Sequence, residues 1–555
     1  MEDYSDSNTT NWNGTLKSAS SDWRRPFTEP RRVRWLAALE DALERFSPGE
    51  RLALYLLATL LCLSALYLVA RVDAAASVIV PAPGGSLTEG ETGPARFINP
   101  LLATSQADQD LTALVYSGLM RHMPDGSLAP DLAESYSISS DGRTYTFRLR
   151  PNATFQDGTK VTSADVVYTV MEAQDPGINS PEAADWMGVA VSAPDPETVV
   201  FTLPKAYAPF LYDTTLGILP AHLWSGIPDE EFPFSSLNTH PVGSGPYKIA
   251  KVQTDSTGAA VRYDLSPFSK FTLGPPYLSR ISFVFFQDDA SMLSALNAGS
   301  IDAIAGLSPD MLSSVTGGGV SAVAVPLPRT FGVFFNQSHN PVLADSAVRA
   351  ALSAATDRAE IVQQSLSGMG AILTGPIPPG ALGNAAPAMP APLGSLSAAA
   401  TSSAASATLA SNARALLSQG GWSWNGSAWT KGKQTLSFTL STADQPQLVA
   451  TAHELASQWQ AAGVQVSVQV YPLAQLNGSV IAPRQYDALL FGEVEGPQLD
   501  LYAFWDSTQR SDPGLNLALY TNAKADALLS QARATTNTGA RDALYQQFAD
   551  LLQRD

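Results

Sequence analysis

The chain has 555 residues, of which 45% are apolar and 15% charged, and its formal net charge is -18. A chain of this length exceeds what one hydrophobic core usually fills, so we expect two or more lobes. The negative charge falls entirely within residues 72–555 and argues against a nucleic-acid partner, because phosphate backbones require a basic face. The single cysteine, Cys62, and five scattered histidines provide no disulfide framework or metal-ligand pairing, so we expect neither a metal nor a cofactor.

The first predicted element is a membrane-spanning helix at residues 52–70. The stretch LALYLLATLLCLSALYLVA contains no charge over 19 residues, and as a helix it would be about 28 Å long, close to the hydrocarbon thickness of a bilayer. The preceding SPGE predicts a helix start with a capping box between Ser47 and Glu50. Eight Lys or Arg residues precede the stretch and only Arg71 follows closely, which predicts a cytoplasmic N-terminus and an extracytoplasmic remainder.

The segments on either side of this anchor have different characters. Residues 1–51 are expected to be cytoplasmic and to contain a short amphipathic helix at the inner membrane face, because apolar residues recur there at helical spacing. These residues are Val33, Leu36, Leu39, Leu43 and Phe46. Residues 71–86 are rich in Ala, Pro, Gly and Ser and are expected to form a linker. Within it, DAAAS at 73–77 leaves cleavage as an alternative to a retained anchor.

Strand and helix signals alternate through the rest of the chain. Residues 135–150 predict a β-hairpin around Asp141-Gly142, and residues 161–173 predict a helix capped by Thr162 and Asp165. Further strands are predicted at 281–286, 330–336, 464–470 and 486–492. A helix with Leu448, Ala452, Leu455 and Trp459 on one face is predicted to end at Gly463. The low-complexity segment 376–412 predicts a surface loop.

The segment HPVGSGPYKIAKVQ, residues 240–253, looks at first like a phosphate-binding loop. Such a loop needs successive N–H donors that lead into a helix, whereas Pro246 lacks a donor and YKIAKVQ alternates like a strand. Gly243 and Gly245 are therefore predicted to permit a sharp backbone corner. Asp157-Gly158 predicts a tight turn with a structural role.

These segments, taken in order, resemble the extracellular solute-binding proteins of family 5. That family includes the oligopeptide-, dipeptide- and nickel-binding subunits of bacterial ABC importers. Its F-x-D-G-x-x-x-[ST]-x-x-D-V stretch is matched by Phe155, Asp157, Gly158, Thr162, Asp165 and Val166. Its G-[ST]-G-P-Y corner is matched by Gly243, Ser244, Gly245, Pro246 and Tyr247. The resemblance covers roughly residues 86–550.

The resemblance implies a two-lobe α/β periplasmic-binding-protein fold (type II, cluster C-like), here preceded by one transmembrane helix. Lobe 1 would span 87–329 with an inserted subdomain at about 120–240, lobe 2 would span 330–520, and helices would occupy 521–555. Family members normally return to lobe 1 with a strand after these helices, so the chain is expected to stop short of that strand. Ligand would lie between the lobes, and the closed form would be presented to an ABC permease and its ATPase subunits.

The resemblance also points to candidate ligand-binding residues. Peptide-binding members carry an acidic residue, after the strand that matches 486–492, that pairs with the peptide amino group. Gly496 stands at that position here, so Glu493, Glu495 and Asp500 are alternative partners for a cationic ligand group. The competing interpretation is that these are solvated carboxylates at a strand end.

Four other residues are candidates with a structural alternative. Tyr502 and Trp505 share a helix face and would either line an apolar pocket or pack inside lobe 2. Asn336 ends a strand near the expected hinge, where its amide could contact ligand. Tyr116 faces either the cleft or the core.

The sequence thus predicts a membrane-tethered, extracytoplasmic solute-binding subunit of an ABC importer that takes oligopeptides or a similar small solute. The alternative is a ligand-sensing or adaptor ectodomain that signals through its anchor. No G-x-S-x-G elbow, metal-ligand cluster or Ser/His/Asp arrangement is evident in the sequence, so we do not expect an enzyme.

Overall fold

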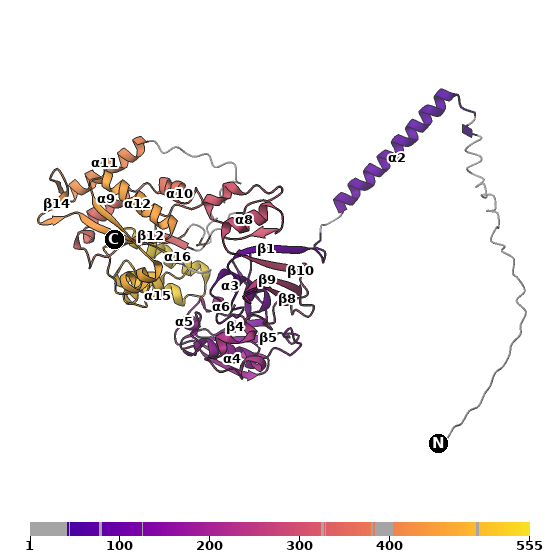
Figure 1. Cartoon of the computed structure of the whole chain (residues 1–555), viewed down its shortest axis with the longest axis horizontal. Coiled ribbons are helices and arrows are strands. Elements are labelled where there is room, and N and C mark those ends of the chain that lie inside the picture. Colours follow the sequence, from indigo (N-terminus) through magenta and orange to yellow (C-terminus); the bar gives the residue numbers. More distant parts are fainter. Residues whose placement is uncertain are drawn as a thin grey trace, which may run out of the picture. The chain divides into compact units, whose positions relative to one another are not determined.

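The computed structural model describes residues 42–43, 45–76, 80–124, 126–323, 327, 329–378, 381–382, 403–494 and 499–555. The chain forms two separate compact units, Met1–Pro81 and Ala82–Asp555 (Figure 1). Most of the amphipathic helix predicted around residues 33–46 lies outside the described residues.

The N-terminal unit contains one long apolar helix, α2 (Pro48–Ala76). Its Pro48–Val72 part is long and apolar enough to cross a membrane. The predicted capping box is confirmed, because the backbone N and Oγ of Ser47 each donate a hydrogen bond to Glu50 Oε2 at 2.8 Å. The helix therefore begins four residues before the predicted span 52–70 and continues beyond its end.

The larger unit begins with a five-stranded sheet of order β11-β1-β10-β9-β8. Its strands are β1 (Ser86–Thr92), β8 (Tyr247–Thr254), β9 (Ala260–Pro267), β10 (Arg280–Phe286) and β11 (Ala303–Ile304). Strand β1 runs parallel to β10 and β11, whereas β8, β9 and β10 pair antiparallel. Helix α8 (Asp289–Asn297) packs on one face of this sheet, where Met292 lies beside Gly90. Helix α3 (Gln106–Val115) lies on the opposite face, toward which the Glu91 side chain points.

A second sheet lies within the sequence between β1 and β8, with order β4-β5-β7-β6. Its strands are β4 (Ala133–Ile138), β5 (Thr144–Leu149), β6 (Ala190–Asp195) and β7 (Thr198–Thr202). The predicted hairpin is confirmed, since β4 and β5 pair antiparallel around Gly142, whose φ is 66°. The small sheet β2 (Met120–His122) with β3 (Leu128–Pro130) and four helices complete this region: α4 (Ser163–Gln174), α5 (Ala183–Trp186), α6 (Phe210–Asp213) and α7 (Ala221–Trp224).

Two sequence features explain why this region folds locally as it does. Helix α4 begins with the predicted capping box, in which Thr162 N and Oγ1 both donate to Asp165 Oδ2 at 2.8 Å. The alternating residues Phe147 and Phe201 face each other across β5 and β7, with ring centroids 5.7 Å apart, in an edge-to-face contact. Trp186 and Phe210 close the same aromatic core.

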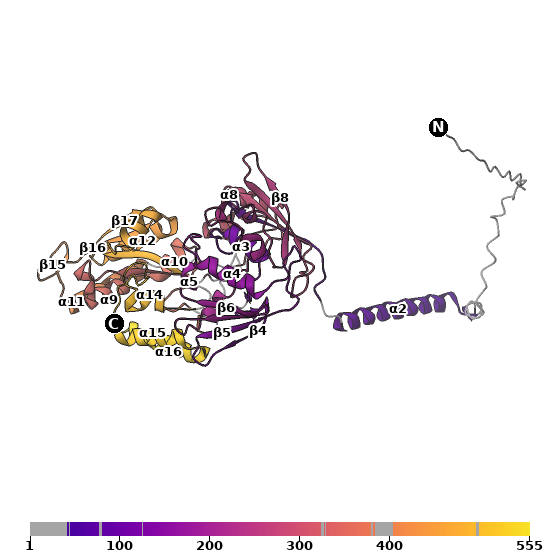
Figure 2. The same cartoon turned by 90° about the horizontal axis from the view of Figure 1, so that it is seen from below.

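Residues 329–494 build a second α/β layer around a sheet of order β12-β18-β16-β17 (Figures 1 and 2). The strands are β12 (Arg329–Phe335), β16 (Ser437–Ala443), β17 (Gln465–Tyr471) and β18 (Ala488–Val494), so the predicted strands in this region are confirmed to within two residues. Helices α9 (Ser346–Ala355), α10 (Arg358–Ser365), α11 (Ser403–Gln419) and α12 (Pro446–Ala461) pack with it, beside a meander of β13 (Ser423–Trp424), β14 (Trp429–Lys431) and β15 (Gln434–Thr435). The predicted buried face of α12 is confirmed.

The loop predicted at 376–412 is wrong at its C-terminal end, because α11 already begins at Ser403. Alanine has the highest helix propensity, and this end of the segment is alanine-rich. Ala410, Ala413 and Leu417 are buried in the same core as Val348 and Ala351 of α9. Small side chains therefore allow α11 to pack closely against α9. The prediction of a loop assumed that a segment of small residues could not contribute to a hydrophobic core.

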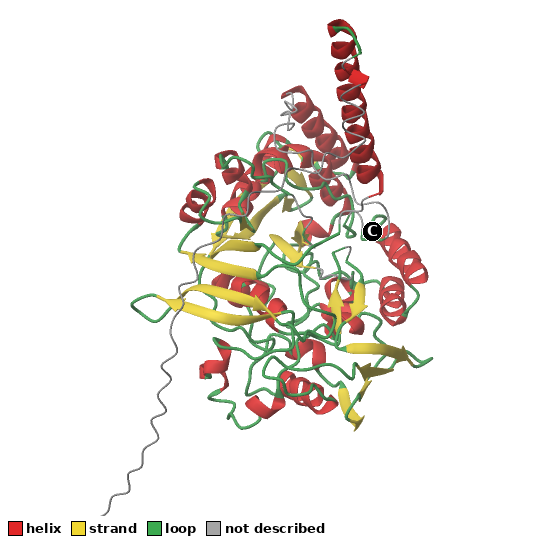
Figure 3. Ribbon diagram, turned by 90° about the vertical axis from the view of Figure 1, so that its right-hand side faces the viewer, coloured by secondary structure: helices red, strands yellow, loops and turns green. Residues whose placement is uncertain are grey.

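The C-terminal residues form their own small helical core. Helices α14 (Tyr502–Trp505), α15 (Ala523–Ala534) and α16 (Thr538–Leu552) bury Leu501, Leu529 and Phe548. The remaining short segments are α13 (Leu473–Gln475), η1 (Phe232–Phe234), η2 (Ser236–Asn238), η3 (Pro309–Ser314), η4 (Pro341–Ala344), η5 (Leu476–Ile481) and η6 (Ser507–Gln509). The larger unit is thus a mixed α/β protein (Figure 3). Its two parts are called the first lobe (residues 86–304) and the second lobe (residues 329–555).

The Gly243–Gly245 corner packs directly against the backbone at the end of α3. Gly245 N donates to Val115 O at 2.8 Å, and a Cβ on Gly245 would lie 2.6 Å from Leu114 O. A Cβ on Gly243 would overlap Val115 O. Neither glycine has a positive φ. Close approach, and not a left-handed conformation, therefore requires glycine at both positions.

Gln156, in the turn before Asp157, joins this corner to the second sheet. Its Nε2 donates to Val115 O at 3.1 Å and to Tyr247 O at 2.8 Å, and its backbone N donates to Gly243 O at 2.8 Å. The turn itself has Gly158 at φ 96°, and Asp157 Oδ2 lies 2.8 Å from His222 Nε2. The two motifs that carry the resemblance, around Asp157 and Gly243, thus meet in space.

We predict that Gly245→Ala lowers the free energy of unfolding by roughly 2 kcal/mol or more, because the added methyl group overlaps backbone atoms that cannot move independently. Gly226→Ala is the matched control, since no atom lies within 4 Å of a Cβ at that position. Chemical denaturation of both variants measures the difference. Equal stabilities would show that the corner tolerates a side chain.

Candidate functional site

An apolar rim lies at the ends of β12 and β18. Phe331 is 51% exposed and Val494 is 60% exposed, although both belong to strands. The Phe331 ring covers Gly492, where a Cβ would lie 2.7 Å from the ring. Phe331 and Val494 belong to the same face of the paired strands, so together they form a small apolar surface that is a candidate for contact with a ligand. Phe331 was not among the predicted site residues, because aromatic content predicted only a strand at 330–336 and carried no information on exposure.

Glu493 lies beside this rim on the opposite face of β18. It pairs in register with Thr330, and its side chain is only 7% exposed. A carboxylate this buried is stabilised by a hydrogen-bonding or cationic partner. Glu495, the second candidate, lies outside the described residues.

Asn336 is a buried residue that fixes the turn after β12. Its Nδ2 donates to Arg484 O at 2.8 Å, and its Oδ1 accepts from the backbone N of Ser338 and His339 at 3.1 and 3.0 Å. Both polar atoms of the amide are therefore used within the second lobe. These hydrogen bonds account for an asparagine at position 336 without a ligand contact.

Tyr116 lies in the core of the first lobe at the end of α3, and burial raises the pKa of its phenol. Its ring contacts the Gly243 corner, and its Cβ lies against Gly217. No hydrogen-bond partner for its hydroxyl occurs among the described residues. Of its two predicted environments, the core is the one observed.

Tyr502 and Trp505 occupy the short helix α14 but have different neighbours. Trp505 packs edge-to-face on Tyr520 and Phe548, with ring centroids 6.2 and 6.0 Å away. Tyr502 instead lies under the guanidinium of Arg533, at 4.6 Å from the ring centroid. Trp505 is thus part of the C-terminal core, whereas Tyr502 faces a charged group.

Arg533, on α15, is the centre of a charged cluster that the sequence analysis did not identify. Its Nε lies 3.1 Å from Asp500 Oδ2. Asp500 was one of three candidate partners for a ligand amine, and here it already has an arginine partner. Burial raises the pKa of nearby Asp213 to about 8, and Asp185 contributes to the shift. No short-range pattern could have revealed the cluster, because Asp213 and Arg533 are 320 residues apart.

A second acidic group lies in the first lobe between β1 and α3. Glu91 is 5% exposed, and none of the described residues donates a hydrogen bond to either carboxylate oxygen. Burial raises the pKa of Glu91 to about 8, and the neighbouring Asp110, Glu89 and Asp108 add to this shift. Asp108 itself accepts hydrogen bonds from two backbone amides. A neutral, protonated Glu91 is therefore favoured at neutral pH.

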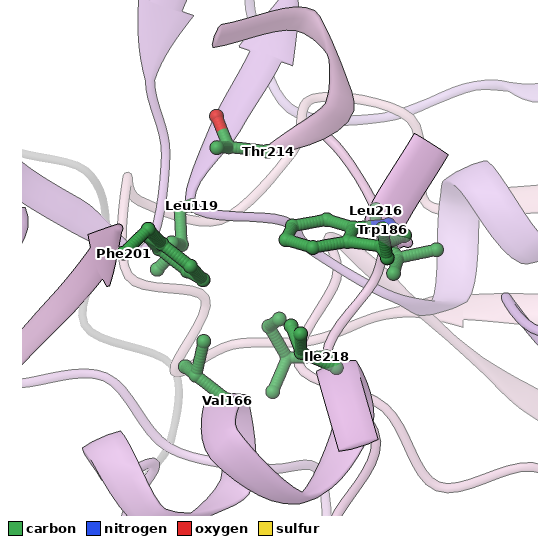
Figure 4. Close-up of a pocket in the computed structure, with 8 residues that line it drawn as sticks. Leu119, Val166, Trp186, Phe201, Thr214, Leu216 and Ile218 are labelled. Atoms are coloured by element: carbon green, nitrogen blue, oxygen red, sulfur yellow. The ribbon is translucent and has the colours of Figure 1, made fainter. Parts of the chain in front are cut away.

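An enclosed apolar pocket in the inserted region has no room for a ligand. It is lined by Leu119, Val166, Val170, Trp186, Phe201, Thr214, Leu216 and Ile218 (Figure 4). The labelled side chains converge on a space too narrow for a water molecule. This pocket is a packing gap in the core. Within the described residues, no group of three His, Cys, Asp or Glu side chains could hold a metal ion.

Two α/β lobes that bury acidic and aromatic side chains near their boundary are the arrangement that binding proteins of the periplasmic type have. The model for the bacterial extracellular solute-binding proteins, family 5, middle region, matches residues 127–514. The chain belongs to this family and carries an extracytoplasmic solute-binding domain.

Relatives of known name agree with this assignment. Protein XP55 of Streptomyces lividans is 29% identical over 491 residues, covering 87% of this chain and 82% of that protein. The probable D,D-dipeptide-binding periplasmic protein DdpA of Escherichia coli is 28% identical, covering 85% and 87%. The fold is similar to that of the oligopeptide-binding protein AppA from Bacillus subtilis in complex with a nonapeptide. In that comparison the TM-score is 0.60 and the identity 23%, over 85% of this chain and 92% of the other.

We predict that the stability of the protein falls as the pH rises from about 5 to 8, in part because of Glu91. The folded pKa is about 8 against an ordinary value of 4.5. Across this window the folded protein therefore retains a proton that the unfolded chain releases. The contribution of Glu91 to the free energy of unfolding is complete below pH 4.5. It is lost as the pH increases, by roughly 1 kcal/mol per pH unit.

Glu91→Gln should flatten this slope, since an amide does not titrate. Glu134→Gln removes an exposed carboxylate from β4 and is the control that should leave the slope unchanged. Urea unfolding at several pH values measures both. Parallel curves for Glu91→Gln and the parent chain would contradict the prediction.

Proposed function

We propose that this protein is the solute-binding subunit of an ABC importer that takes oligopeptides or a similar small solute. The observation that carries the proposal is the match of the family-5 region over 127–514, on a chain with two α/β lobes. The names of two relatives support a peptide ligand, since one is called a D,D-dipeptide-binding protein and the other was solved with a nonapeptide. Lobe closure around the ligand would present it to a permease and an ATPase in separate subunits.

The ligand site that we propose is the rim at the ends of β12 and β18. Phe331 and Val494 offer exposed apolar surface for ligand side chains. Glu493 lies on the opposite face of β18 from the apolar rim, and Glu495 follows this strand in the sequence. These two carboxylates are proposed for a ligand amine that reaches past the strand end, because Asp500 is already paired with Arg533. Asn336 and Tyr116 remain weaker candidates, because the protein itself uses the Asn336 amide and Tyr116 is buried in the core.

We also propose that α2 tethers the binding domain to the membrane. The helix has the length and composition of a single span, and the excess of Lys and Arg before it supports a cytoplasmic N-terminus.

Addition of peptides is predicted to raise the unfolding temperature of the full chain. A ligand that binds only the native state, at 100 times its Kd, adds about 2.7 kcal/mol to the free energy of unfolding. Thermal-shift measurements with peptides of two to nine residues test this, with free amino acids as the control. An unchanged unfolding temperature across all peptides would count against a peptide ligand.

Replacement of Glu493 by Gln is predicted to weaken binding of peptides with a free amino terminus by roughly tenfold, because a charge-assisted hydrogen bond is lost. N-acetylated versions of the same peptides carry no ammonium group, so their affinity should be insensitive to the substitution. Calorimetry on both peptide forms separates the effects. An equal loss for both forms would assign Glu493 a structural role.

The alternative is a sensor that signals through its anchor, and it is motivated by the 50 residues that precede the apolar helix. Purification from native membranes distinguishes the two proposals. An importer subunit should bring down a permease and an ATPase, whereas a sensor should bring down neither.

A further inference from the structure

Arg533 stands in the second lobe, held by neighbours from that lobe. Its Nε is 3.1 Å from Asp500 Oδ2, and its guanidinium lies 4.6 Å above the ring of Tyr502. These contacts orient the flat guanidinium, so that one of its faces is covered by an aromatic ring. An arginine positioned in this way is well suited to stack a second ring on the other side.

The second ring comes from the first lobe. Tyr207 lies in the segment between β7 and α6, and its ring centroid is 4.7 Å from Arg533 Cζ. The next residue, Ala208, donates its backbone N–H to Arg533 O at 2.9 Å. The Tyr207 segment is anchored in its own lobe, because Tyr145 Oη donates to Tyr207 O at 3.0 Å. One residue of the second lobe therefore contacts a fixed segment of the first lobe through both its side chain and its backbone.

The charges around this contact explain why a cation is required there. Asp213 of the first lobe lies near Asp185 and Glu182 of the same lobe and near Asp500 of the second lobe, and after burial these three neighbours raise the pKa of Asp213 further. Arg533 opposes this shift. Without the positive charge of Arg533, the pKa of Asp213 would rise further, and Asp500 would lose its cationic partner at a partly desolvated boundary.

The strength of the contact is suited to a reversible connection. The Arg533 side chain is 34% exposed, so water already reaches it while the two lobes are in contact. Cation–π contacts and ion pairs at such sites are weak enough to break on the time scale of domain motion, unlike a buried hydrophobic interface.

We propose that Arg533 is an interlobe latch that favours the closed arrangement of the two lobes before any ligand binds. It acts by stacking between Tyr502 and Tyr207 and by accepting the backbone hydrogen bond from Ala208 at its carbonyl oxygen. Because a ligand enclosed by both lobes binds the closed form, the latch sets the fraction of binding-competent protein and hence the apparent affinity. The effect on affinity rests on the proposed function, whereas the effect on lobe arrangement does not.

The test measures the distance between the lobes in the ligand-free full chain, reconstituted in nanodiscs. Spin labels at Ser256→Cys in the first lobe and Lys433→Cys in the second, in a Cys62→Ala background, report this distance by double electron–electron resonance. Both label positions are exposed. Arg533→Ala and Tyr207→Leu should shift the distribution to longer distances. The second variant leaves the Asp500–Arg533 pair intact and retains an apolar side chain, so it keeps the test decisive if Arg533→Ala folds poorly.

Two further variants isolate the latch. Tyr207→Phe keeps the ring but removes the hydroxyl that interacts with Asp500 and Arg533, so it should lengthen the distance less than Tyr207→Leu does. Lys524→Ala removes an exposed positive charge from the same helix, α15, and should leave the distance unchanged. Unchanged distances in both Arg533→Ala and Tyr207→Leu would overturn the proposal, as would an equal lengthening in Lys524→Ala.

A second arm measures binding of an equimolar mixture of peptides of two to nine residues. The half-saturating concentration should rise by roughly fivefold to tenfold in Tyr207→Leu and by a smaller factor in Tyr207→Phe, which keeps the ring. Longer distances with an unchanged half-saturating concentration would overturn the link between the latch and affinity. If the parent chain binds none of the peptides, the proposed peptide function fails, and the distance measurement still decides the latch.

Discussion

The close approach of the Gly243–Gly245 backbone to the end of α3 is the contact on which the first lobe depends. Three chain segments that are far apart in sequence meet there, and the Gln156 side chain bonds to two of them. Because backbone lies against backbone, the distance leaves no room for a side chain. The same contact ties the sheet β4-β5-β7-β6 to the sheet that contains β1. This explains why glycine, and no other residue, suits a corner that has no left-handed φ.

The acidic character of the chain has local consequences at two buried sites. In the first lobe, Glu91 is enclosed with other carboxylates between β1 and α3, so that it favours the protonated form. At the lobe boundary, Arg533 is the cationic partner of Asp500, whereas the neighbouring Asp213 has a pKa raised to about 8 and favours the protonated form. Both sites show the same principle: a buried carboxylate must either take up a proton or find a cation. Protonation of the carboxyl group is compatible with a rigid core. Pairing with a cation is compatible with a contact between lobes that can separate.

Much of the fold could be predicted from local pattern. The capping boxes at Ser47 and Thr162 begin helices α2 and α4, the Asp141-Gly142 turn connects β4 to β5, and the alternating strands fall within two residues of their predicted ranges. Helix α11 was missed at its start because alanine-rich composition is compatible with both a loop and a closely packed helix. The candidate site was harder to predict, since exposure of Phe331 and burial of Tyr116 depend on which elements cover them.

The sequence by itself determined the apolar helix, the order of the strands and helices, and the family to which the chain belongs. Each of these depends on residues that are close together in the chain or on motifs of defined spacing. Only the tertiary structure decided that Asp500 is occupied by Arg533, that Asn336 is used by its own turn, and that Tyr207 and Tyr502 enclose one guanidinium. The physical reason is distance along the chain. Tyr207 and Arg533 belong to different lobes, and an interaction between them has no local signature before the chain is folded.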